Sequence, residues 1–190
     1  MLKNKTVTKV VGFSLMELVV VIAILGTVAI AIPRFMGRTS LYKRHQFIRN
    51  FGTLVARGWQ RAISTGQVHK IFIDYAHKRV ELQSLADQSD KNFKPQFTPV
   101  RSDYNGNFIT WPKNFVLKNL IINGHDEVTS YGFGNTFKDG WFYISSSGII
   151  QDVIINFLDE DEKVAGKSRP VSLVINPFTA QLTVYDSFKK

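Results

Sequence analysis

The chain contains no cysteine among its 190 residues. Disulfide bonds, thiolate zinc sites and cysteine nucleophiles are therefore excluded, although an oxidising compartment still fits the sequence. The four histidines are scattered, and none stands in a spacing typical of a metal or catalytic site. No glycine-rich phosphate loop occurs, and Ser145-Ser146-Ser147-Gly148 lacks the flanking glycines of a nucleophile elbow. The sequence therefore predicts neither an enzyme nor a cofactor.

Acidic residues are missing from one long stretch. Residues 34–65 contain seven lysines and arginines but no acid, and residues 1–12 add three lysines. Residues 66–190 hold 14 basic and 14 acidic side chains, so the net charge of +9 lies outside them. A nucleic-acid-binding domain carries its own basic patch, so nucleic acid is not an expected partner. A basic helix of this kind suits anionic lipid or acidic neighbouring subunits.

An apolar run between Gly12 and Pro33 carries only one charge, at Glu17. Its length is that of a membrane-spanning helix, which needs about 20 residues. A carboxylate within such a segment is costly and by default functional. A secretory signal peptide would have a shorter apolar core with its small-residue cleavage site after it, whereas here the glycine precedes the core. An ordinary signal anchor would have no need of Glu17.

The segment GFSLMELVVVIAILGTVAIAIP resembles the N-terminus of type IV pilins and of the pseudopilins of type II secretion. The resemblance implies cleavage by a prepilin peptidase after Gly12 and N-methylation of the new terminus, Phe13. It also implies that Glu17 pairs with the N-terminal amine of a neighbouring subunit during filament assembly. Because lysines and arginines flank the span on both sides, the positive-inside rule does not set its orientation. The resemblance implies a cytoplasmic leader and a periplasmic body.

A second resemblance lies further along, in Ala56-Arg57-Gly58-Trp59-Gln60-Arg61-Ala62-Ile63 with Gly66-Gln67-Val68. This stretch is similar to the end of the helix and the first strand of the H-type minor pseudopilins and related minor pilins. The similarity implies a two-sheet β domain on a long helix, placed at or near a filament tip.

Residues 34–65 are predicted to form a helix that continues the span and ends at Thr65-Gly66, with a kink near Pro33. Its apolar stripe is expected to pack on the β domain and consists of Leu41, Ile48, Phe51, Val55, Trp59, Ala62 and Ile63. Period-two patterns then predict a hairpin at 71–82. Residues 84–107 are expected to form a long loop with at most a short strand. Further strands are predicted at 108–111, 115–122, 141–145, 149–157, 171–176 and 181–185, with a turn at 176–180. The fold class is α+β, a long helix on antiparallel sheet.

Two short motifs in the β region bear on calcium and DNA binding. The acidic run from Asp159 to Glu162 makes Asp159 and Asp161 weak calcium candidates, but consecutive acids lack the alternating spacing that converges on one ion. An exposed hairpin tip is the favoured interpretation. Gly166-Lys167-Ser168-Arg169 is similar to a basic motif of DNA-uptake minor pilins, but neighbouring acids would repel phosphate. A plain turn is favoured there.

The predicted organisation is a cleaved leader at 1–12, a transmembrane helix at 13–33, an amphipathic helix at 34–65 and a β-rich periplasmic domain at 66–190. The expected function is that of a minor pseudopilin, a structural subunit of a type II secretion pseudopilus at the bacterial inner membrane. Expected partners are other pilin-like subunits, prepilin peptidase, membrane lipid and the assembly platform. The alternatives are a minor pilin of a type IV pilus or competence system, and an enzyme tethered by a pilin-like anchor.

Overall fold

The computed structural model describes residues 14–36, 40–86, 96–100, 108–129 and 137–190. The chain divides into two compact units, residues 1–39 and residues 40–190, and each is described by itself. Gly12 and Phe13, the predicted cleavage and methylation positions, lie outside the described residues.

The first unit holds helix α1, Leu15–Met36. Helix α1 continues for three residues past Pro33, where the sequence predicts a kink within a helix that goes on. Among the residues that the structure describes, no helix is long and apolar enough to cross a membrane.

The second unit begins with helix α2, Ser40–Thr65, which ends where the sequence predicts, with Gly66 in a left-handed conformation (φ 64°). Phe51, Val55 and Ala62 of the predicted stripe are buried in the core. Leu41 and Ile63, at the two ends of the predicted stripe, are instead exposed, so the buried stripe is shorter than predicted. It also includes Phe47 and Leu54, which are buried.

One glycine sets how closely α2 approaches the strands. A Cβ at Gly58 would lie 2.9 Å from side-chain atoms of both Leu82 and Ile144. The missing side chain therefore lets the helix backbone sit directly on the core side chains of the sheet.

One sheet contains β1 (His69–Asp74), β2 (Arg79–Leu85), β3 (Phe97–Pro99), β4 (Phe108–Thr110) and β7 (Asp139–Ile144). Its order is β3-β2-β1-β7, with β4 also pairing with β2, and the pairs are antiparallel. The predicted hairpin is confirmed, because Ile71 pairs with Leu82 and Ile73 with Val80. The alternation places these four side chains in the core.

The other sheet contains β5 (Phe115–Ile122), β6 (His125–Asp126), β8 (Val153–Val164), β9 (Lys167–Ile175) and β10 (Leu182–Tyr185), in the order β10-β9-β8-β5-β6. The sequence predicts a strand at 149–157, whereas β8 begins four residues later and ends seven residues later. The end is missed because the apolar pattern breaks after Leu158 while the strand continues through the acidic run. The turn at 176–180 is confirmed: the Asn176 side chain accepts hydrogen bonds from the backbone N–H groups of Phe178 and Thr179.

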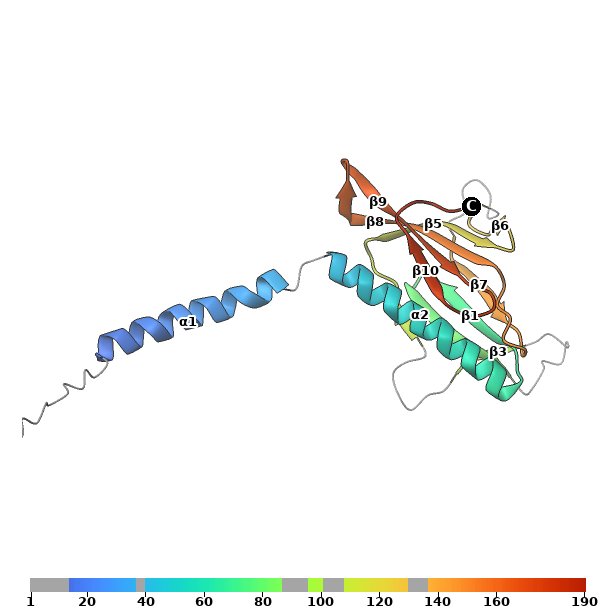
Figure 1. The fold of residues 1–190 in the computed structure, drawn as a ribbon, viewed down its shortest axis with the longest axis horizontal. Coiled ribbons are helices and arrows are strands. Elements are labelled where there is room, and N and C mark those ends of the chain that lie inside the picture. Colours follow the sequence, from blue (N-terminus) through green and yellow to red (C-terminus); the bar gives the residue numbers. More distant parts are fainter. Residues whose placement is uncertain (1–13, 37–39, 87–95, 101–107, 130–136) are drawn as a thin grey trace, which may run out of the picture. The chain divides into compact units, whose positions relative to one another are not determined.

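The core of the second unit is shared by both sheets and α2 (Figure 1). An aromatic cluster fills its centre, where Phe47 of α2 lies edge-on to Trp111 and Phe115, with ring centroids 5.1 and 5.5 Å apart. The Trp111 indole N–H donates to the carbonyl of Phe115 at 2.8 Å, which satisfies the polar atom of this fully buried side chain. The predicted α+β class, a helix on antiparallel sheet, is confirmed for this unit.

Candidate assembly and docking sites

Glu17 lies in the first turn of α1. The carbonyl of Ser14 accepts hydrogen bonds from the backbone N–H groups of Glu17 at 3.0 Å and Leu18 at 3.2 Å, which starts the helix. A carboxylate at this end is stabilised by the helix dipole. The Glu17 side chain is exposed, and so are its apolar neighbours Leu15 and Met16. This end of α1 therefore presents one negative charge on an apolar surface.

The described side chains of α1, residues 15–28, are all exposed within the single chain. Contiguous apolar surface of this extent marks a region that contacts lipid or other protein. Among the described residues of the first unit, nothing covers this apolar surface.

Arg44 of α2 shows that part of the basic helix charge is neutralised within the chain. Its side chain is buried and pairs with Glu162 of β8. Arg169 of β9 donates to the same carboxylate at 2.8 Å and to Asp186 at 2.6 Å. Hydrogen bonding with Arg169 lowers the pKa of Asp186 and, in return, raises the pKa of Arg169. The expectation that the charges of this helix meet anionic lipid or acidic neighbouring subunits is therefore wrong for Arg44.

The acidic run lies in the β8–β9 hairpin, and Glu160 and Asp161 are exposed as the sequence predicts, but the run is not the turn itself. Asp159 is fully buried, and β8 continues beyond it to Val164. The tip instead lies at Ala165-Gly166, both with positive φ. Asp159 departs from the prediction because it still pairs with Phe115 of β5, whereas the acids after it lie beyond that pairing.

The Asp159 carboxylate is only half satisfied. One oxygen accepts hydrogen bonds from the Asn114 side chain at 2.7 Å and from the backbone N–H of Asp161 at 3.2 Å. The other oxygen is buried and has no hydrogen-bond partner among the described residues. Burial accordingly raises the pKa of Asp159.

The calcium candidates gain no support from this geometry. Within the described part of the chain, no group of three or more acidic or histidine side chains is placed to hold a metal ion. Asp161 is exposed, and the contact that joins it to Asp159 is made by its backbone.

Of the four residues that resemble a basic DNA-uptake motif, only the first lies in the predicted turn, and the other three begin strand β9. Gly166 lies at the hairpin tip (φ 79°), and Arg169 is engaged by Glu162 and Asp186.

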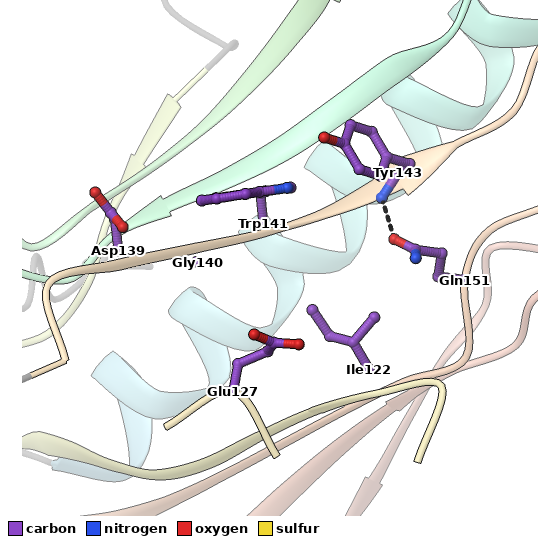
Figure 2. A pocket seen from close by; sticks show the side chains of 7 residues that line it. All are labelled: Ile122, Glu127, Asp139, Gly140, Trp141, Tyr143 and Gln151. Atoms are coloured by element: carbon purple, nitrogen blue, oxygen red, sulfur yellow. Dashed lines mark hydrogen bonds between the residues drawn. The ribbon is translucent and has the colours of Figure 1, made fainter. Parts of the chain in front are cut away.

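A small cavity of about 170 Å³ lies beside β7 (Figure 2). Trp141 and Tyr143 of β7 line it together with Ile122, Glu127 and Gln151. The backbone N–H of Tyr143 donates to the Gln151 side chain at 2.8 Å. The residues that line this cavity with Trp141 come from segments distant in the sequence, so no local pattern brings them together.

Lys70 of β1 lies among the aromatic side chains next to this cavity. Its ammonium group is 4.6 Å from the ring centroid of Phe97, 5.3 Å from that of Phe72 and 5.6 Å from that of Trp141. Burial lowers the pKa of Lys70, while the nearby charge of Asp139 acts in the opposite direction. The exposed face of this sheet therefore combines aromatic surface with a partly desolvated cation.

Two solved structures of the minor pseudopilin EpsH, from the type 2 secretion system of Vibrio cholerae, are similar to this chain. Each has a TM-score of 0.50 and 14% sequence identity, and the match covers 75% of this chain and 95% or 93% of the other. The chain has a pseudopilin-like fold. At this identity the likeness concerns the fold and not the residues of a site. No protein-family model matches the sequence, and no curated protein matches it.

Proposed function

We propose that this protein is a structural subunit of a type II secretion pseudopilus. The observation that carries the proposal is the combination, in one chain, of a pseudopilin-like fold in the body and an apolar N-terminal helix with a single carboxylate.

In this proposal the chain is inserted in the inner membrane, cleaved after Gly12 and methylated at Phe13. Helix α1 then leaves the lipid for a bundle of similar helices, where its exposed apolar side chains are buried. Glu17 favours one register of that bundle, because an amine of a neighbouring subunit offsets the cost of its charge in an apolar environment. The β domain lies in the periplasm and contacts other subunits. The protein acts by assembly and not by catalysis.

A strain lacking the gene tests the proposal when compared with its complemented parent. We expect normally secreted enzymes to accumulate in the periplasm and to return to the culture supernatant on complementation. Normal secretion in the deletion strain would contradict the proposal.

The second candidate function is a minor pilin of a type IV pilus or DNA-uptake system, which the same N-terminal motif supports. Normal secretion with a loss of twitching or of transformation would favour it. The equal numbers of basic and acidic residues in 66–190 speak against DNA binding by the β domain.

A further inference from the structure

Strand β7 is an edge strand whose only partner among the described strands is β1. Antiparallel pairing turns the N–H and carbonyl of every second residue of an edge strand away from its neighbour. Tyr143 is turned away in this sense, because its N–H donates to the Gln151 side chain at 2.8 Å and its carbonyl accepts from the Gln151 N–H at 3.2 Å. Trp141, two residues earlier, has the same orientation, and no described residue bonds to its N–H or carbonyl on that side. The edge of β7 is therefore open at Trp141.

The cavity of about 170 Å³ lies against this open edge (Figure 2). Gly140, Trp141 and Tyr143 form its β7 side, whereas Ile122 comes from the other sheet and Glu127 from the segment after β6. Pockets for small organic ligands usually measure about 300–1,000 Å³, so this cavity is small for a free ligand. Its size suits one side chain of a larger partner.

Glu127 gives the cavity a negative charge that the described residues do not neutralise. Its half-buried side chain extends toward β7 (Figure 2) and belongs to none of their ion pairs. Asp139, the second acid of the lining, has Lys70 as a nearby cation. Lys138 and His125 are exposed and adjoin these segments in the sequence, but neither lines the cavity. The lining thus contains two carboxylates and no lysine or arginine, which favours a basic side chain as the occupant.

We propose that β7 binds an extended segment of a partner protein as an added strand, with a lysine or arginine side chain of that segment in the cavity beside Glu127. The main chain of the segment bonds to the N–H and carbonyl of Trp141, which the sheet leaves open. Side chains of an added strand alternate between the two faces of the sheet, so the neighbours of the basic residue lie beside the Trp141 indole, which is 42% exposed. Because main-chain pairing accepts many sequences, the charge of Glu127 supplies the preference for a basic residue.

A synthetic peptide tests the charge preference. The probe is a short labelled peptide of alternating threonine and valine residues with one central arginine, titrated by fluorescence anisotropy into the full-length protein in detergent micelles. We expect saturable binding that weakens about tenfold when citrulline, a neutral isostere, replaces the arginine. Absence of saturable binding, or equal affinity for the two peptides, would overturn the proposal.

A variant of the protein locates the charge that the peptide meets. Glu127→Gln should weaken binding of the arginine peptide about tenfold and remove its advantage over the citrulline peptide. Glu160→Gln is the matched control, because this exposed acid of β8 forms no ion pair among the described residues, and it should leave the affinity unchanged. Equal effects of the two substitutions would rule out the cavity as the site.

Backbone methylation tests the strand pairing. An added strand directs every second amide toward β7, so N-methylation of one alternate set of peptide amides should abolish binding, whereas methylation of the other set should leave the affinity within about twofold. Hydrogen exchange should also show protection of the Trp141 amide in the presence of the arginine peptide. Equal effects of the two methylation patterns, or unchanged exchange at Trp141 under saturating peptide, would overturn the proposal. The assay contains no other secretion protein, so its failure and a normal secretion phenotype are distinguishable results.

Discussion

Arg44 and Glu162, 118 positions apart in the sequence, form a largely buried ion pair that ties α2 to the β8–β9 hairpin. The pair joins two segments that composition alone would have assigned to solvent, a basic helix face and an acidic loop. Removing one partner of a buried pair leaves the other charge exposed to the low-dielectric interior.

Arg44→Met should therefore destabilise the β domain. We expect a loss of about 2 kcal/mol, because Glu162 keeps its second partner, Arg169. The measurement is urea denaturation followed by tryptophan fluorescence. Arg79→Met is the control, since the Arg79 side chain is 46% exposed in its pair with Glu81, against 7% for Arg44; a change of less than about 0.5 kcal/mol is expected there. Equal effects in the two variants would contradict a special role for the buried pair.

Asp159→Asn should stabilise the domain at neutral pH. The folded protein raises the pKa of Asp159 by burial, so its ionised form is penalised in the folded state. The sign follows: this group's contribution is favourable below its unfolded pKa and is lost as pH rises through the folded pKa. The asparagine keeps an acceptor for Asn114 and carries no charge. Thermal unfolding at a series of pH values from about 4 to about 7 should show an advantage for the variant that grows with pH. An advantage that shrinks with pH would refute this account.

Two glycines of α2 should respond oppositely to alanine. At Gly58 a Cβ would meet Leu82 and Ile144 at 2.9 Å, so the packed side chains must move. At Gly52 the nearest atom would be 3.6 Å away, an ordinary contact, and alanine favours the helix. We expect Gly58→Ala to be less stable than Gly52→Ala by about 1–2 kcal/mol in urea denaturation. Equal stability would mean that the close approach at Gly58 relaxes at no cost.

Gly12→Ala should block removal of the leader if residues 1–12 are a prepilin leader. Mass spectrometry of the membrane-bound protein should then find the unprocessed chain, whereas the unaltered protein should begin at a methylated Phe13. A variant that still begins at Phe13 would refute the cleavage assignment.

Glu17→Ala should leave the chain membrane-bound but reduce its incorporation into filaments about tenfold, because the charge that favours one register is gone. The measurement is the ratio of sheared filament subunit to membrane subunit. Glu17→Asp is the conservative control and should retain part of the incorporation. Incorporation of the alanine variant at the unaltered level would rule out an assembly role for this carboxylate.

Local patterns were sufficient for most of the architecture. The hairpin at 71–82 followed from period-two alternation, and the end of α2 followed from Thr65-Gly66, because both are set by neighbouring residues. The resemblance of residues 12–33 to prepilins suggested the class, and the pseudopilin-like fold of the solved neighbours agrees with it. The processing steps remain predictions, since Gly12 and Phe13 lie outside the described residues.

What the sequence could not determine are relations between distant segments. The sequence predicts exposure for the whole acidic run, whereas Asp159 is buried, because its burial depends on Phe115 and Asn114, more than forty positions away. The seven cations of residues 34–65 are alike in the sequence, but Arg44 pairs with Glu162 of β8, whereas no ion pair among the described residues includes Arg49. The sequence by itself determined which segments form helix and strand, through side-chain periodicity and turn residues. Only the tertiary structure decided which charged side chains form ion pairs within the fold, because pairing depends on distance in space.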